Sequence, residues 1–263
     1  MKSIITCRTR ALTLSLAIAG IVCSTPASAA STDADFAPLA KARNVDAIEA
    51  LATERLAKDP GDDVALWYWA RLVSGHAAKR DLLIPRLEQC VKDLPMSARC
   101  HSALGSLYGA AAMSAGITGG MKYVGKIKDA MIRAVELDPA RFEMRRDLVQ
   151  FYLQAPGIVG GSVRRANEHA NEFAKYDAAR ASLLRAEVQA YEKDFAKAEA
   201  TLNAVKPGND PDLADALMAA YANLGFGLIN ASNPAEAQQL FERRLAATPN
   251  NATLHFGLGR ALL

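Results

Sequence analysis

The chain has 263 residues and carries 31 Lys and Arg against 28 Asp and Glu, a formal net charge of +3. Lys2, Arg8 and Arg10 lie in the first 30 residues, which contain no acid, so the remainder is formally neutral and lacks the basic surface of a nucleic-acid-binding protein. Hydrophobic residues make up 51%, which excludes a disordered polymer, and abundant alanine with only 6% aromatic residues favours an all-α protein.

Residues 1–30 have the features of a secretory signal peptide. A basic start precedes an uncharged run over residues 11–22, and Pro26 and small residues up to Ala30 follow. A membrane anchor is the alternative, but the run is short for a span of about 20 residues. Cys23 raises the option of a lipoprotein, which the bulky Val22 before it disfavours. We expect a mature domain of residues 31–263 without an integral membrane span, in the periplasm or, alternatively, secreted.

Cleavage of this leader would leave one pair of cysteines, Cys90 and Cys100, in an oxidising compartment. The two lie five residues on either side of Pro95, where a turn between antiparallel helices would bring them together. We therefore expect a disulfide. Two separate buried thiols are the alternative.

Prolines recur just after segments whose apolar residues have helical spacing. Proline ends one helix and starts the turn to the next. No segment alternates with period two as a strand would. The chain is therefore predicted to form thirteen helices joined mostly by short turns. The prolines concerned are Pro60, Pro95, Pro139 and Pro249.

A period of 34 residues is visible at the end of the chain, where Leu224-Gly225 recurs as Leu258-Gly259. Between them lie Ala237, Phe241 and Pro249. This spacing resembles the tetratricopeptide repeat (TPR) family, and four weaker matches extend the resemblance over residues 44–263. It implies a right-handed α-solenoid of about six TPR helix hairpins plus a C-terminal helix. A non-repeating helical bundle is the alternative.

The small residues of the motif have a physical reason, since glycine lets two helix backbones approach. Gly105, Gly225 and Gly259 are expected to be such contacts. His101 and His255 are both expected to pack between helices, and His255 lies one 34-residue period after Tyr221.

Two adjacent units are longer than the others between their helices, and both extra segments contain Gly-Ile-x-Gly-Gly. Loops at equivalent points emerge on one edge of a solenoid, so the pair is a candidate edge for a ligand or partner. Alternatively, the glycines only supply positive φ in long turns and each isoleucine plugs the gap between helices. The residues are Gly116, Ile117, Gly119, Gly120, Gly157, Ile158, Gly160 and Gly161.

The sequence contains no recognisable catalytic constellation, such as Gly-x-Ser-x-Gly or His-Glu-x-x-His. A partial phosphate-loop pattern at Gly120, Gly125 and Lys126 is rejected because Ile127 stands where a Ser or Thr should hold magnesium. Cysteine and histidine spacing is poor for a metal site. We expect no enzymatic activity, no cofactor and no metal.

The TPR resemblance also implies a partner-binding groove formed by first-helix positions. An exposed tryptophan beside arginines would suit a protein or peptide that carries acidic groups or a free carboxylate. Alternatively, Trp67 belongs to the core and the arginines are solvated. The groove residues are Trp67, Arg71, Arg99, Ser102, Arg146, Gln150, Phe226, Phe256 and Arg260.

The last nine residues, 255–263, carry one full charge, Arg260, and several apolar side chains that do not fit on one helix face. An uncovered apolar end finds a partner, so we expect a homodimer or docking to another envelope protein through this helix, with simple burial as the alternative. The overall expectation is a periplasmic TPR scaffold for protein–protein interaction in envelope assembly or maintenance. The alternative is a protein that binds or carries a small ligand or lipid with its glycine loops.

Overall fold

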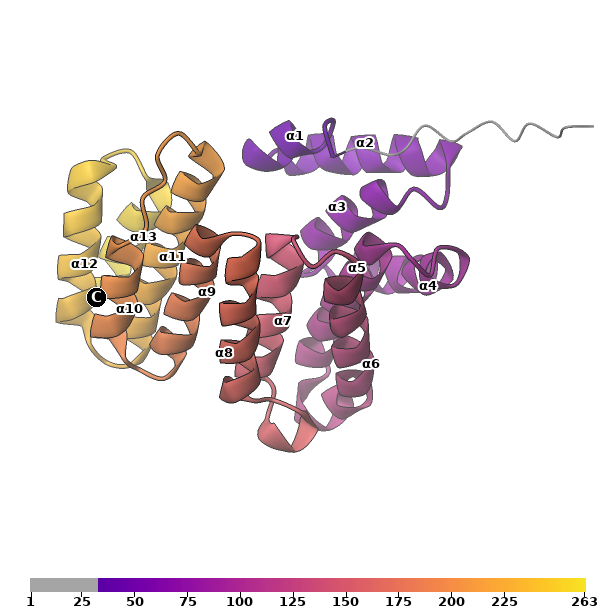
Figure 1. Ribbon diagram of the computed structural model, residues 1–263. Coiled ribbons are helices and arrows are strands. Elements are labelled where there is room, and N and C mark those ends of the chain that lie inside the picture. Colours follow the sequence, from indigo (N-terminus) through magenta and orange to yellow (C-terminus); the bar gives the residue numbers. More distant parts are fainter. Residues whose placement is uncertain (1–32) are drawn as a thin grey trace, which may run out of the picture. The chain divides into compact units, whose positions relative to one another are not determined.

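The computed structural model describes residues 33–263, so the expected signal peptide lies outside the described residues (Figure 1). Residues 33–263 form thirteen α-helices, two short 3-10 helices and no strand. The elements are α1 (Ala37–Lys41), α2 (Val45–Lys58), α3 (Asp63–Val73), α4 (Ala77–Asp93), α5 (Ala98–Ser114), α6 (Gly116–Leu137), α7 (Phe142–Gln154), η1 (Gly157–Val159), α8 (Val163–Glu172), η2 (Phe173–Lys175), α9 (Ala178–Tyr191), α10 (Phe195–Asn203), α11 (Pro211–Asn230), α12 (Pro234–Ala247) and α13 (Ala252–Ala261).

The local sequence sets where these helices begin and end. Eight of them follow an Asn, Asp or Ser whose side chain accepts a hydrogen bond from the backbone N–H three residues on. The four helices α2, α4, α6 and α12 each end two residues before a proline, as predicted. The all-α prediction is confirmed.

Successive helices pack as pairs: α3 against α4, α5 against α6, α7 against α8, α9 against α10 and α11 against α12. The first helix of a pair also contacts the first helix of a neighbouring pair, as α3 does α5, α7 does α9, and α9 does α11. Contacts between neighbouring units are the mark of a helical repeat array. The right-handed superhelix stays a prediction.

Phe241 of α12 lies where α11 and α13 come close to this helix, and its side chain is fully buried. A Cβ atom on Gly225 of α11 would lie 2.2 Å from Phe241 Cζ, and one on Gly257 of α13 would lie 2.3 Å from the same atom. Gly105 has a similar role, with Met131 Cγ 3.0 Å from its Cβ position. The expectation for Gly259 was wrong, because α13 turns Gly257 toward α12 and leaves Gly259 exposed, with nothing within 4 Å of its Cβ position.

The buried apolar side chains form two clusters that meet in α9. Leu184 and Val188 belong to the cluster built from α2 to α9, whereas Leu183 and Ala186 belong to the cluster built from α9 to α13. The helix therefore buries two different faces and supports a core on each side.

His101 and His255, both expected to pack between helices, share a different role. His101 Nε2 lies 3.1 Å from the carbonyl oxygen of Pro95, and His255 Nε2 lies 2.7 Å from that of Pro249. In both cases the ring bonds the turn six residues upstream, so the expected packing between helices is corrected to a contact with the turn.

Candidate functional site

Trp67 and Ser102, two of the expected groove residues, are buried. The Trp67 side chain is 4% exposed, and its Nε1 donates to Ser102 Oγ at 3.2 Å. Tyr68 packs edge-on against the indole with ring centroids 4.8 Å apart. A bonded indole on the inner face of α3 has no surface to offer a partner, so the alternative that placed Trp67 in the core is the correct one.

The guanidinium groups of Arg71 and Arg141 lie 5.0 and 5.7 Å from the Trp67 ring. Together with Arg99, which shares Asp33 with Arg141, and Arg146, which lies near Asp147 as Arg71 does, they form what we call the arginine face. Arg99 and Arg141 both donate to the same oxygen, Asp33 Oδ2, at 3.0 and 2.9 Å. Partial burial alone would raise the pKa of Asp33, but the hydrogen bonds from Arg141 and Arg99 reverse this and hold the pKa below its ordinary value. The arginine face thus already holds one carboxylate.

The residues next to Asp33 complete a short bound segment, 33–36. Phe36 is fully buried and stacks on Tyr68, with ring centroids 4.8 Å apart and planes 10° from parallel. The Arg55 guanidinium lies 5.2 Å from the Phe36 ring and bonds Asp35 at 3.2 Å. Two acidic side chains and one aromatic ring are therefore recognised by arginines and a tyrosine.

Arg71 and Arg146 meet a pair of acids instead. Arg71 Nη1 lies 3.5 Å from Asp147 Oδ2, and its guanidinium lies 5.0 Å from the Trp67 ring. Burial raises the pKa of Asp147 although Arg71 and Arg146 oppose it. Burial likewise raises the pKa of Glu187 to about 7, with Arg146 opposing. Arg71 and Arg146 are therefore already opposed by carboxylates of this chain.

The other expected groove residues lie at the C-terminal units. The Phe226 ring lies 6.2 Å from that of Phe256 and 5.8 Å from that of Phe241. Phe256 is 62% exposed, and Arg260 is also exposed. The structure therefore brings Phe226 and Phe256 together as a small aromatic surface on α11 and α13.

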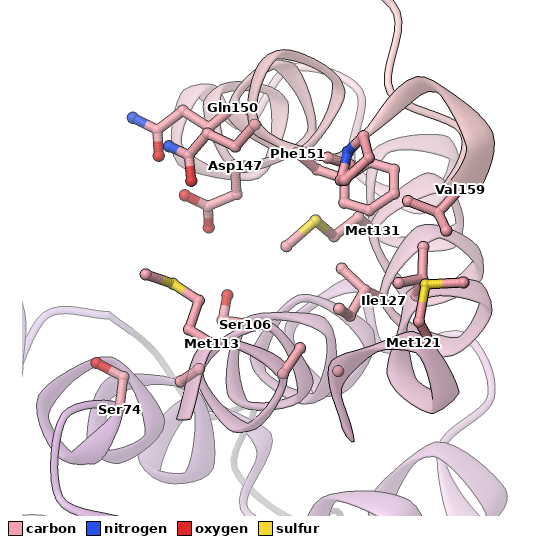
Figure 2. A pocket seen from close by; sticks show the side chains of 18 of the residues that line it. Ser74, Ser106, Met113, Met121, Ile127, Met131, Asp147, Gln150, Phe151 and Val159 are labelled. Carbon is pink, nitrogen blue, oxygen red and sulfur yellow. The ribbon is translucent and has the colours of Figure 1, made fainter. Parts of the chain in front are cut away.

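A cavity of about 720 Å³ opens beside the arginine face, among α3, α5, α6, α7 and η1 (Figure 2). Asp147 and Gln150 line it from α7. Gln150, expected in the groove, therefore faces this cavity. Its lining also contains Gly116 and Gly120 of the first glycine segment and Val159 of the second.

The glycine segments differ from the expected pair of loops. The first is not a loop, because α5 ends at Ser114 and α6 begins at Gly116. Gly116 has φ of +67°, which allows the chain to turn directly from one helix into the next. A Cβ atom on Gly120 would lie 2.8 Å from Ala112 O, so this glycine permits the tight pairing of the two helices. The side chain of Ile117 lies outside the described ones.

The second segment is a short turn through η1. Gly160 has φ of +106°, and a Cβ atom on Gly161 would lie 1.7 Å from Ala155 O. Ile158 is 90% exposed, so it does not plug a gap between helices. The two segments come together through the cavity that they line, not as equivalent loops.

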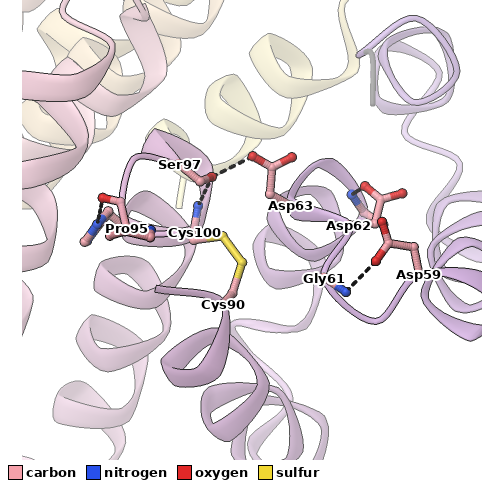
Figure 3. Close-up of a disulfide and its surroundings, with 10 residues drawn as sticks. Asp59, Gly61, Asp62, Asp63, Cys90, Pro95, Ser97 and Cys100 are labelled. Carbon is pink, nitrogen blue, oxygen red and sulfur yellow. Dashed lines mark hydrogen bonds between the residues drawn. A yellow bond between two sulfur atoms is a disulfide. The ribbon is translucent and has the colours of Figure 1, made fainter. Parts of the chain in front are cut away.

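Cys90 and Cys100 are joined as a disulfide between α4 and α5, with Cα atoms 5.9 Å apart (Figure 3). Ser97 stabilises the same turn by accepting a hydrogen bond from Cys100 N at 3.1 Å and donating to Asp63 Oδ2 at 2.6 Å. The turn is thereby tied to α3 as well as to α4.

Two features of residues 33–263 bear on function class. No group of three or more His, Cys, Asp or Glu side chains among them could hold a metal ion. None of their helices combines the length and apolar character needed to cross a membrane.

No protein-family model matches the sequence, and no curated protein matches it. Solved structures that match this chain include TTC0263, a thermophilic TPR protein of Thermus thermophilus, with a TM-score of 0.48 and 18% identity over 86% of this chain and 94% of that chain. YrrB, a TPR protein with an unusual peptide-binding site, gives 0.40 and 14% over 78% and 96%. Naa15/Naa10 bound to HypK-THB gives 0.29 and 14% over 86% and 38%.

The fold is of the TPR type. This follows from the chain's own helix pairs and from Gly225, Ala237 and Phe241, which are buried at the repeat positions where the motif places them. In this TPR-type array the sequence did not reveal Asp33 or Arg141. Asp33 is only the third residue after the expected cleavage site and looks like the end of a leader, and no local pattern links it to an arginine 108 positions away.

Proposed function

We propose that the protein is a non-enzymatic scaffold, exported to the periplasm, that binds protein partners in envelope assembly or maintenance through its arginine face. The observation that supports this most directly is the carboxylate of Asp33 held between Arg99 and Arg141. Arginine forks recognise carboxylates with geometric specificity. A partner segment with an acid close to an aromatic residue would use the same contacts.

The segment 33–36 gives this recognition a concrete form. Its acid and its ring are separated by two residues, and they occupy the Arg99–Arg141 fork and the Tyr68 ring. A partner that binds here competes with the chain's own segment. Only molecules whose own segment has left the site can bind a partner. The apparent affinity is therefore the intrinsic affinity multiplied by the fraction of molecules with a vacant site.

Site-specific photocrosslinking in the periplasm tests the proposal. A photoreactive residue replaces Asp35, an exposed member of the bound segment, and in the control variant it replaces the exposed Leu82 on α4. We expect discrete protein adducts from position 35 that are absent from position 82. A soluble peptide of residues 32–38 should compete, and the same peptide with Asp33→Asn and Asp35→Asn should not. Equal adducts at both positions, or competition by both peptides, would contradict the proposal.

A further inference from the structure

The cavity among α3, α5, α6, α7 and η1 belongs to no part of the proposed scaffold. Its volume of about 720 Å³ is within the range of about 300–1,000 Å³ found for small-molecule sites. Residues from both glycine segments and from three packed helices line it, so its wall is made by tertiary structure.

The wall has two chemically different sides. Figure 2 shows Met121, Ile127 and Val159 on one side of the cavity and Ser106 and Asp147 on the other. A ligand that covers both must have an apolar part and a polar part.

The apolar side suits a flexible chain. Of the seven methionines in the sequence, three line the cavity: Met121 lies on this side, Met131 lies between the two sides, and Met113 lies beside Ser106 on the other (Figure 2). Methionine is unbranched and polarisable, so it adapts to ligands of variable shape. Met113 is 80% exposed and Met121 is 50% exposed, so a bound chain would cover apolar surface that water now contacts.

The polar side favours a ligand whose head group is uncharged. Asp147 is the one ionisable residue among those that line the cavity, so no lining cation is present to hold a carboxylate or a phosphate. Arg71 already pairs with Asp147 at 3.5 Å. An ammonium head would have to displace Arg71 to reach this carboxylate, which is the one charged group in the lining. Hydroxyl and amide groups remain on Ser74, Ser106, Gln150 and Gln154.

We propose that this cavity binds a single-chain amphiphile whose head group is uncharged and carries hydroxyl or amide groups. The chain lies against Met121, Ile127 and Val159, and the head exchanges hydrogen bonds with the serine and glutamine side chains. This site adjoins the arginine face at Asp147, but its occupancy needs no protein partner.

Calorimetric titration of residues 31–263 with three twelve-carbon probes at pH 7.5 tests the head-group claim. The probes are monolauroylglycerol, lauric acid and dodecylamine, each below its micelle concentration. We expect one monolauroylglycerol per chain, bound at least tenfold more tightly than either charged probe. No binding of monolauroylglycerol, or equal or tighter binding of a charged probe, would overturn the proposal.

Matched methionine variants test the location. Met121→Glu places a charge in the apolar wall, while Met96→Glu alters a methionine that is 71% exposed outside the cavity. Monolauroylglycerol affinity should fall at least tenfold in the first variant and change less than twofold in the second. Val159→Glu, on the same side of the cavity, replaces Met121→Glu if circular dichroism shows that the latter is unfolded. Equal affinities in the wall variant and in Met96→Glu would place the ligand elsewhere and refute the site.

Discussion

Gly225 and Phe241 are in a contact that leaves no room for a methyl group. A Cβ atom on Gly225 would lie 2.2 Å from Phe241 Cζ and 2.7 Å from both neighbouring ring carbons. The ring cannot retreat toward α13, because the Cβ position of Gly257 lies 2.3 Å from the same Cζ atom. The glycine is therefore a packing requirement of the last units.

Gly225→Ala should lower the free energy of unfolding by about 1–3 kcal/mol, since overpacking outweighs the gain of roughly 1 kcal/mol in helix propensity. Gly259→Ala is the control, because nothing lies within 4 Å of its Cβ position, and it should stabilise by about 0.5–1 kcal/mol. Urea denaturation followed by circular dichroism measures both. Equal stability of the two variants would contradict the packing role of Gly225.

The pair Cys90 and Cys100 should show no free thiol in protein isolated from the periplasm. The bridge closes a loop with a sequence separation of 10 and should contribute on the order of 2–3 kcal/mol in the chain-entropy model. A reducing agent should therefore lower the melting temperature of the natural chain and leave that of Cys90→Ala/Cys100→Ala unchanged. Two reactive thiols in the denatured, unreduced protein would refute the bridge.

Asp33→Asn should destabilise the fold by about 1–2 kcal/mol at pH 7, because the carboxylate bonds two arginines. The pKa of Asp33 is lowered in the folded state, so its contribution is present above the unfolded value and is lost as the pH falls through the lowered pKa. The two proteins should converge in stability at low pH. Asp129→Asn on α6 is the control, because Asp129 forms none of the ion pairs found in residues 33–263. This substitution should change the free energy of unfolding little.

Glu187 should make stability depend on pH in the opposite direction. Burial raises its pKa to about 7, so the unfolded chain loses this proton at a lower pH than the folded chain. Relative to Glu187→Gln, the natural protein should lose on the order of 2–3 kcal/mol of stability as the pH rises from 4.5 to 8. Glu192→Gln, at an exposed position, is the control for removing a carboxylate, and a flat difference for Glu187→Gln would be evidence against the raised pKa.

The dimer expected through the last helix stays a prediction. Phe256 and Leu262 are both exposed, at 62% and 63%. Light scattering of residues 31–263 should give twice the monomer mass, and Phe256→Glu/Leu262→Glu should give the monomer. Leu82→Glu on α4 is the control for adding charge to an exposed apolar residue. If the natural chain and the Phe256→Glu/Leu262→Glu variant are both monomers and crosslink equally to partners, the prediction that this helix is an interface is wrong.

Much of the fold was predictable because its signals are local. Prolines mark the ends of α2, α4, α6 and α12, and the repeat places Gly225 against Phe241. The site was less predictable. The depth of Trp67 depends on a register that a one-residue shift changes, and the link from Asp33 to Arg141 joins distant positions. The glycines of α6 indicated a loop, although Gly116 turns the chain within one residue.

The two buried clusters that meet in α9 have a consequence for how the array unfolds. Leu184 and Val188 serve one core while Leu183 and Ala186 serve the other, so each half keeps its own buried cluster when contacts across this helix are lost. Contiguous cooperative units of this kind open independently, with different free energies. Hydrogen exchange should therefore show two plateaus, with the amides of α3 to α8 separated in protection from those of α10 to α13. The disulfide between α4 and α5 lies in the first group and should make it the slower one to exchange.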